Sequence, residues 1–301
     1  MTPRNSVKLW PLFLFAFVCM LSVVIIATKG VLARDLADIR AAGTLRHLGV
    51  PYAGFIISKD QGLDVEIMQA FAKHLGVDYE FIATDWVNAI QSLTGKNFTI
   101  EGSGVAVTGE TPVTGDVLAT GLTILGWRKA LLNFSSPTFP TQVWLVVRAD
   151  SSLTPIVPTG DTNKDITLTR EKLNGLSVLH KAGTCLDPRL FNLDAAGAKG
   201  SEFPGSLNDL APAVIIGDAE ATLLDVPDAM VALQKYPGKI KIIGPLSSEQ
   251  EMAVGFAKDQ PELLAQFNTF FADFKRSGRL AELVNRYYPM LNRYYPAYFA
   301  N

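Results

Sequence analysis

Few side chains in this 301-residue chain have the type and spacing that metal or redox chemistry needs. His47, His74 and His180 lie far apart and show none of the short spacings of metal ligands. Apart from Cys19, which lies in an apolar run near the start, Cys185 is the only cysteine, so the remainder cannot form an intrachain disulfide. We therefore expect no metal, no cofactor and a fold that packing alone stabilises.

The carboxyl groups that acid–base catalysis would use are isolated. Glu220 and Glu251 are the two candidates for a general acid, and the sequence identifies no partner for either. The charge is nearly balanced, with 27 Lys and Arg against 29 Asp and Glu and no basic block, so nucleic acid is not an expected partner. We expect no catalytic residue, no enzyme activity and a small molecule as the ligand.

The start of the chain has the order of a secretory signal. Arg4 and Lys8 precede an uncharged apolar run at 10–27, and small residues follow up to Ala33. Residues 1–33 are therefore expected to be a signal peptide that directs the protein to the periplasm. The run is also just long enough to cross a bilayer, so an uncleaved N-terminal membrane anchor is the alternative.

Residues 34–301 are enough for two lobes, each with its own core. Strand and helix patterns alternate along them, which is typical of an α/β fold with parallel strands. A loop rich in Pro, Thr, Ser and Gly at 151–165 marks the entry to the second lobe. We expect strands at 45–50, 79–82, 116–119, 143–147, 177–179, 213–216 and 239–243, and helices at 62–75, 86–93, 261–278 and 280–287.

Two stretches do not fit this pattern. Residues 96–115, KNFTIEGSGVAVTGETPVTG, alternate β-branched residues with Gly and Thr and predict either an extra hairpin or a long loop. The motif RYYP occurs at 286–289 and again at 293–296. An aromatic clasp on the lobe surface is the expected role of this tail, with a partner-docking site as the alternative.

Six segments, in order, resemble the signature blocks of the family 3 periplasmic solute-binding proteins, which serve ATP-driven importers of polar amino acids. They are DLADIRAAGTLRHLGVPYAGF, GLDVEIMQAFAKHLGVDYEF, GDVLATGLTILGWRKALLNFSSPTFPTQVWLVV, VLHKAGTCLD, LLDVPDAMVAL and PELLAQFNTFFADFKRSGRLAELVNRYYP. The resemblance implies a type II periplasmic-binding fold, two α/β lobes joined by a two-crossing hinge. It also implies a small carboxylate-bearing ligand, an amino acid or an analogue, delivered by a monomer to an ABC permease in the inner membrane.

The order of the blocks implies domain boundaries. Residues 34–140 would form the first part of lobe 1, and 141–250 would form lobe 2. Residues 251–301 would complete lobe 1 and add the tail, so that the chain crosses the hinge near Pro140 and near Gln250.

The resemblance also implies ligand-binding residues. Arg128 stands where the family's arginine binds the ligand α-carboxylate, a task that suits a planar guanidinium with two parallel donors; without the resemblance it would be a surface arginine. Gly121 and Thr123 would add a backbone group and a hydroxyl to the same carboxylate. From lobe 2, Thr184 would add its N–H and hydroxyl, and Cys185 stands where a second hydroxyl residue is common.

The opposite end of the ligand has its own candidates. Asp225 matches the carboxylate that holds the α-ammonium, and an N-cap is its alternative role. Tyr52 matches an aromatic residue that stacks on the ligand side chain, and Trp86 is expected to wall the same pocket; a plain core role is the alternative for both.

The departures from the family pattern leave the ligand's identity open. No acidic residue precedes Tyr52, which disfavours a lysine, arginine or histidine ligand, and Leu125-Gly126-Trp127 replaces the usual Thr-Pro-Glu before the arginine. A cyclohexadienyl-dehydratase-like enzyme on the same fold and a ligand-sensing receptor module are the alternatives to a transport protein. A lytic glycosidase would need a further catalytic domain and is not expected.

Overall fold

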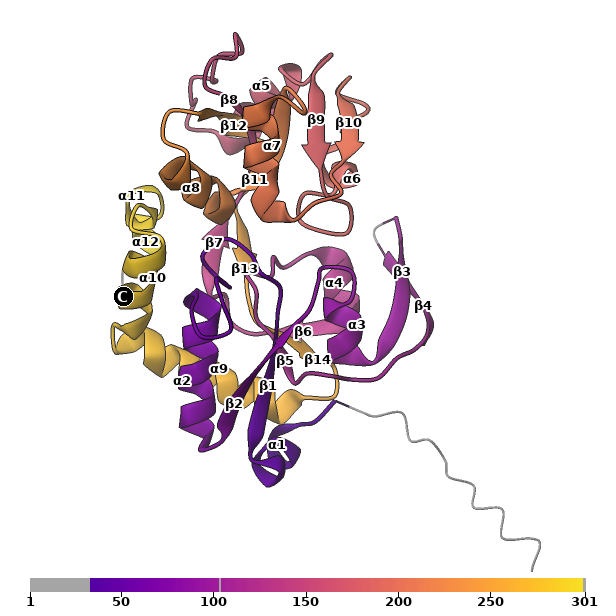
Figure 1. The fold of residues 1–301 in the computed structure, drawn as a ribbon, viewed down its shortest axis with the longest axis vertical. Coiled ribbons are helices and arrows are strands. Elements are labelled where there is room, and N and C mark those ends of the chain that lie inside the picture. The colour runs from indigo at the N-terminus through magenta and orange to yellow at the C-terminus, as the bar shows by residue number, and fades with distance from the viewer. Residues whose placement is uncertain (1–32, 103, 300–301) are drawn as a thin grey trace, which may run out of the picture.

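The computed structural model describes residues 33–102 and 104–299. Apart from Ala33, the predicted signal peptide lies outside these residues. Within the described part of the chain, no helix combines the length and the apolar character that crossing a membrane requires. The chain forms two α/β units, each built on a five-stranded sheet (Figure 1). We call the unit with the N-terminal strands lobe 1 and the other lobe 2.

The lobe 1 sheet has the strand order β2-β1-β5-β14-β6. Its strands are β1 (Thr44–Gly49), β2 (Asp78–Ala83), β5 (Val117–Leu118), β6 (Leu132–Phe134) and β14 (Gly255–Ala257). Its helices are α1 (Leu36–Ala42), α2 (Leu63–Leu75), α3 (Ala89–Thr94), α4 (Gly126–Leu131), α9 (Pro261–Arg276) and α10 (Arg279–Tyr287). Strand β1 pairs in parallel with β2 and β5, whereas β14 is antiparallel to β5 and β6. The sheet is therefore mixed, because β14 arrives from the far end of the chain.

Helix α2 shows how local sequence sets an element. Ile67 and Phe71 lie one turn apart and are both buried, as the apolar period predicts. The helix begins after Gly62, whose φ is 145° and where a Cβ would lie 2.1 Å from the Phe55 carbonyl oxygen, so only glycine fits. It ends at Gly76, which takes the left-handed conformation of a C-cap.

The lobe 2 sheet has the strand order β10-β9-β11-β8-β12. Its strands are β8 (Val143–Arg148), β9 (Ser177–His180), β10 (Lys199–Glu202), β11 (Ala221–Asp225) and β12 (Ile240–Pro245). Its helices are α5 (Thr162–Glu171), α6 (Pro188–Phe191), the 3-10 helix η1 (Leu207–Asp209), α7 (Leu210–Ile216) and α8 (Val226–Lys235). Strand β8 lies inside the sheet and is antiparallel to both β11 and β12, and its first five residues are buried.

Two short strands connect the lobes. Strands β7 (Phe139–Thr141) and β13 (Gln250–Met252) form an antiparallel pair, with Pro140 opposite Glu251. In Figure 1 the pair lies between the two lobes. The lobe boundaries expected near residues 140 and 250 stay a prediction.

One predicted strand is wrong. The apolar run at 213–216 belongs to helix α7, and the strand follows it as β11. A run of four apolar residues does not distinguish a strand from a buried helix segment, and Gly217 ends this one in the left-handed conformation of a helix C-cap.

The stretch 96–115 contains a hairpin, one of the two predicted alternatives. Strands β3 (Lys96–Glu101) and β4 (Gly104–Glu110) pair antiparallel. Their residues Phe98, Ile100 and Val105 pack against a cluster of buried apolar residues in lobe 1. The hairpin extends from lobe 1 toward the side of lobe 2 that carries α6 (Figure 1).

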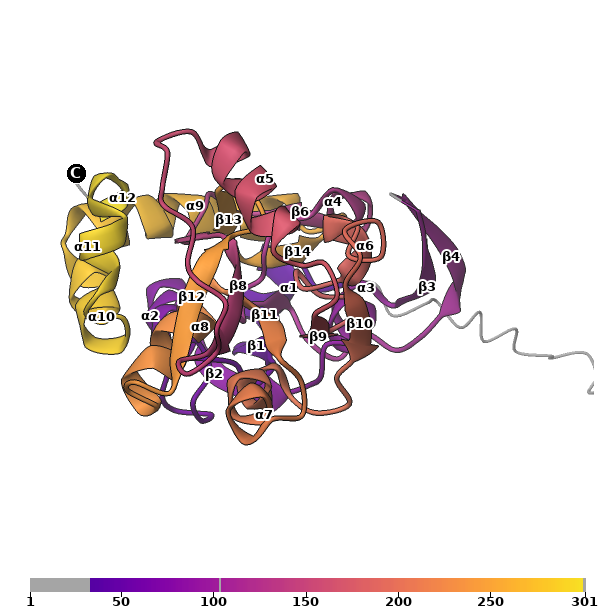
Figure 2. The same ribbon diagram turned by 90° about the horizontal axis from the view of Figure 1, so that it is seen from above.

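The C-terminal tail contacts both lobes. It consists of α11 (Leu291–Tyr294) and α12 (Pro296–Phe299), and it lies with α10 on the opposite side of the molecule from the hairpin (Figure 2). The ring of Tyr294 lies 6.4 Å from that of Trp144 in lobe 2, while Lys275 of lobe 1 lies over the Tyr298 ring. These contacts support the predicted aromatic clasp and extend it across the hinge.

Candidate ligand-binding site

Arg128 is a buried cation at the boundary between the lobes. Helix α4 holds it with only 2% of its surface exposed, so it is not the surface arginine of the alternative prediction. Nη1 donates to the Thr123 carbonyl oxygen at 2.9 Å, and Nη2 lies 3.5 Å from the carbonyl oxygen of Gly183 in lobe 2. Nε has no partner. Burial lowers the pKa of Arg128 to about 10, so the guanidinium stays charged at neutral pH.

Two indole rings flank this guanidinium. Its Cζ lies 5.9 Å from the ring centre of Trp86 and 5.2 Å from that of Trp127. Ring faces attract cations, but they do not neutralise the charge. Within the described chain Arg128 has no carboxylate at ion-pair distance. The arrangement is therefore suited to an external anion.

Gly121 and Thr123 lie on the turn before α4 and differ in what they offer. The Gly121 N–H donates to Asp64 Oδ2 at 2.7 Å, and its φ of 60° and the adjacent Phe55 ring exclude a side chain there. Gly121 therefore shapes the turn, and its contact with a ligand stays a prediction. The Thr123 hydroxyl is buried beside Arg128 and forms no standard hydrogen bond with the residues that the structure describes, and the Cys185 thiol is its polar neighbour.

Asp225 is the carboxylate at the opposite end of the site. It ends β11 and caps α8, because Oδ1 accepts the Asp228 N–H at 3.2 Å. Oδ1 also accepts the hydroxyl of Tyr52 from lobe 1, and Oδ2 accepts the Cys185 thiol at 3.5 Å. Burial raises the pKa of Asp225 to about 6, and these bonds only partly oppose the rise. Asp225 therefore has the N-cap role and also faces the other lobe.

The lobe 2 residues Thr184 and Cys185 are both buried beside this carboxylate. The Thr184 hydroxyl donates to the Lys181 carbonyl and accepts the Leu186 N–H, so it stabilises its own turn. Burial and the charge of Asp225 raise the pKa of Cys185, so the sulfur remains a thiol that can donate to Asp225.

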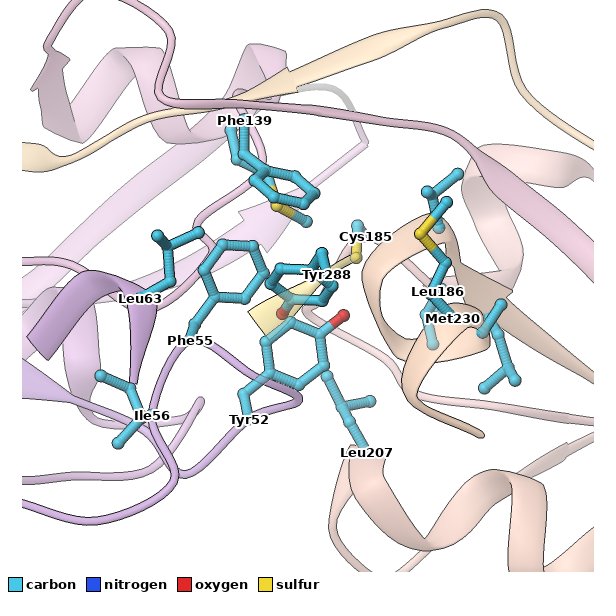
Figure 3. Packing of buried hydrophobic residues seen from close by; sticks show 14 of the residues in the cluster. Tyr52, Phe55, Ile56, Leu63, Phe139, Cys185, Leu186, Leu207, Met230 and Tyr288 are labelled. Carbon is cyan, nitrogen blue, oxygen red and sulfur yellow. The ribbon is translucent and has the colours of Figure 1, made fainter. Parts of the chain in front are cut away.

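Aromatic rings of lobe 1, the hinge and the C-terminal tail pack together behind the site. The edge of the Tyr52 ring meets Trp86 at 5.6 Å, and its face stacks on Phe55. Figure 3 shows Phe55, Phe139 and Tyr288 packed beside Tyr52. Tyr52 is thus a core aromatic and Trp86 is partly buried against the core, and their contact with a ligand stays a prediction.

Three contributing residues were missed by sequence analysis. Asp64 holds the Gly121 turn, and burial raises its pKa to about 7. Asp228 lies beside Asp225 with Oδ2 buried and unpartnered, and burial and Asp225 raise its pKa well above the usual value. Asn208 reaches from lobe 2 to accept the Ala53 N–H at 2.8 Å. No periodic pattern marks Asp64 and Asn208, because each bonds a chain segment distant in sequence, whereas Asp228 stands three residues after Asp225 and could have been noted as its neighbour.

The two candidate general acids lie elsewhere. Glu220 accepts the Ser177 N–H at the end of β11 opposite to Asp225. Glu251 lies on hinge strand β13 and lines a cavity of about 680 Å³ together with Tyr295 and Tyr298 of the tail. Neither carboxyl group forms a hydrogen bond with the site residues described above.

A comparison with protein-family models matches the bacterial extracellular solute-binding proteins, family 3, over residues 34–111 and 113–290. The chain therefore belongs to this family. The L-cystine-binding protein TcyJ of Escherichia coli is 26% identical over 280 residues, which are 91% of each chain. The membrane-bound lytic murein transglycosylase F of Desulfosudis oleivorans is 26% identical over 233 residues, 75% of this chain, and the match spans 44% of that protein's length.

Solved structures confirm the fold. A mutant of ArgBP from T. maritima superposes with a TM-score of 0.66 at 24% identity, covering 84% of this chain and 99% of that one. The ancestral amino acid-binding protein AncCDT-1, a precursor of cyclohexadienyl dehydratase, has a TM-score of 0.64 at 23% identity and covers 84% and 98%. The predicted type II periplasmic-binding fold with two α/β lobes is thus confirmed.

Proposed function

We propose that this solute-binding protein closes its lobes around a small carboxylate-bearing solute, an amino acid or an analogue, and presents it to an ABC permease. It acts in the periplasm as a monomer and without catalysis. The family, the likeness to an L-cystine-binding protein and the signal-like residues 1–33 support this assignment. The positions of Glu220 and Glu251 outside the site give no support to a dehydratase activity.

The observation that carries the proposal is the buried, unpaired charge of Arg128. A ligand carboxylate supplies the missing counter-charge through two parallel hydrogen bonds and reaches the hydroxyl of Thr123. A ligand ammonium binds Asp225 in place of the Tyr52 hydroxyl or the Cys185 thiol. Gly183 and Asp225 come from lobe 2, so both ends of the site are complete only when the lobes meet.

The hinge strands β7 and β13 permit this closure. Each crosses between the lobes once, and they bond to each other, so a small rotation about the pair moves one lobe against the other. Tyr52–Asp225 and Ala53–Asn208 are the bonds that such an opening breaks.

The site also predicts the kind of side chain. Asp228 lies beside Asp225, and burial and the charge of Asp225 raise its pKa, so its negative charge is disfavoured and offers little counter-charge for a cationic side chain. A lysine or arginine side chain would lose its hydration without a partner, which costs several kcal/mol. Neutral and acidic ligands are therefore favoured.

A thermal-shift panel followed by small-angle scattering tests the proposal. We expect L-cystine, L-glutamine or neutral apolar amino acids to raise the melting temperature, because a ligand at a hundredfold excess over Kd stabilises the folded state by about 2.7 kcal/mol. Lysine and arginine should leave the melting temperature unchanged. The best ligand should then reduce the radius of gyration. An unchanged radius at saturation would contradict lobe closure, and a saturable shift with arginine would contradict the pocket chemistry.

A further inference from the structure

The hairpin β3–β4 and lobe 2 enclose a groove on the outer side of Arg128. One part of the groove has a volume of about 350 Å³ and is lined by Trp86, Phe98, Ile100 and Trp127 of lobe 1 and by Gly183 of lobe 2. The adjoining part has a volume of about 320 Å³ and adds Leu190 of lobe 2. Each part is as large as a small-molecule site, which starts at about 300 Å³.

This groove borders the residues that surround the Arg128 guanidinium. Trp86 and Trp127, which line it, are the two rings that flank the Arg128 guanidinium. Gly183, which also lines it, carries the carbonyl oxygen 3.5 Å from Arg128 Nη2. A ligand held by its carboxylate at Arg128 therefore has the groove next to its anchor.

The surface that the groove offers is mainly apolar. Its two cations are already paired, because Arg189 bonds Asp187 through Nε and Nη2, and Lys181 donates to the Phe203 carbonyl at 2.6 Å. The Phe98 ring packs 5.9 Å from that of Trp127, and Ile100 borders both parts of the groove. Aromatic and aliphatic walls without a free charge favour an apolar, ring-sized group.

We propose that this groove is the specificity subsite of the protein and binds a large apolar or aromatic group of the ligand whose carboxylate Arg128 holds. The inference rests on the proposed function. The hairpin strands β3 and β4 lie within residues 34–111, which the family model matches, and they supply the lobe 1 wall of the groove through Phe98 and Ile100. Because the walls come from both lobes, a group in the groove also stabilises the closed form.

Calorimetry with two amino acids that share one head group tests the groove. L-alanine and L-tryptophan differ in the ring that the groove would hold, and the variants Ile100→Ala and Leu190→Ala shorten one wall from each lobe. Val107→Ala is the matched control, because Val107 lies on the same hairpin, is 56% exposed and does not line the groove. Leu190 is 46% exposed, so its truncation should leave folding intact.

We expect the wild type to bind L-tryptophan at least about tenfold more tightly than L-alanine. Ile100→Ala and Leu190→Ala should each weaken L-tryptophan binding by about threefold to tenfold and leave L-alanine binding unchanged, and Val107→Ala should change neither. Equal wild-type affinities, or equal effects of the variants on both probes, would overturn the groove while leaving the proposed function in place. Failure of both probes to bind the wild type would overturn the groove, and it would overturn the proposed function as well only if every amino acid of the thermal-shift panel also failed to bind.

Discussion

Arg128 in lobe 1 and Asp225 in lobe 2 are both buried, but the protein supplies fewer hydrogen-bond partners to Arg128 than to Asp225. Arg128 bonds only to carbonyl oxygens and keeps Nε without a partner. Asp225 accepts bonds from Tyr52, Cys185 and Asp228 before any ligand arrives. The positive end of the site therefore lacks a counter-charge, while the negative end has three donors of its own.

This difference indicates which ligand group matters more. A buried charge without a partner is costly, so a carboxylate at Arg128 removes a penalty as well as forming bonds. An ammonium at Asp225 must replace bonds that already exist, and its net gain is smaller. We infer that the carboxylate is the obligatory part of the ligand and that the ammonium adds selectivity.

The largest effect is expected from Arg128→Lys. Lysine keeps the charge but loses the two parallel donors, and truncating a buried charged partner typically costs ~2–5 kcal/mol. Affinity for the best ligand of the panel should fall by about thirtyfold or more in calorimetry. Lys129→Ala changes the exposed cation next in sequence and should have no effect. A loss below about threefold for Arg128→Lys would remove Arg128 from the site.

A smaller effect is expected from Asp225→Asn. Asparagine still caps α8, and the lost charge should weaken amino-acid binding by about 1–2 kcal/mol, or fivefold to thirtyfold. The same ligand without its amino group should bind the variant as well as it binds the wild type. The control Asp161→Asn changes an exposed N-cap on α5. A loss equal to that of Arg128→Lys would show that the two ends are equivalent.

The smallest effect concerns pH and Asp64. Its folded pKa of about 7 lies above the ordinary 3.8, so folding favours the protonated form, and its contribution to stability increases as pH falls toward and below 7. Urea unfolding of the ligand-free wild type should show a gain from this group of about 0.8 kcal/mol between about pH 8 and pH 6.5. Asp64→Asn should lack this gain, whereas Asp60→Asn, on an exposed side chain, should keep it.

The comparison with Asp64→Asn is needed because other buried groups also change stability in this interval. Asp225, with a folded pKa of about 6, gains stability mainly at lower pH. Burial lowers the pKa of His47 to about 4, so the folded state resists protonation and loses about 0.4 kcal/mol of stability between about pH 8 and pH 6.5. Burial and Asp225 raise the pKa of Asp228, which the wild type and the variant both keep. The same gain in wild type and Asp64→Asn would show that Asp64 does not titrate in this interval.

Helices in which the apolar period continues over several turns could be predicted from the sequence. Helix α2 and helix α9 each carry a stripe of buried apolar residues several turns long, and their ends are set by Gly62, Gly76 and Pro261. The short run at 213–216 carried no such information and was assigned to the wrong element. The short runs at 79–82 and 177–179 did form strands, so a short apolar run alone leaves the choice between helix and strand open.

The site depended on contacts that no local pattern encodes. Tyr52 and Asp225 are 173 residues apart and meet only because the lobes meet. Similarly, Asp64 reaches Gly121 across the lobe 1 sheet, and the sequence shows it only as an acidic residue at the start of a helix. The family resemblance predicted Arg128 and Asp225 as site residues. Only the fold shows that Asp225 has more hydrogen-bond donors around it than Arg128 has acceptors with a counter-charge.

The central claim is that the carboxylate, and not the ammonium, anchors the ligand. Calorimetry on the wild type with three related probes tests it: the best-binding amino acid of the panel, its carboxamide and its deaminated carboxylate. We predict that the carboxamide loses at least about a hundredfold in affinity, or about 2.7 kcal/mol, and that the deaminated carboxylate loses no more than about tenfold. The reverse order, with the carboxamide bound more tightly than the deaminated carboxylate, would contradict the account.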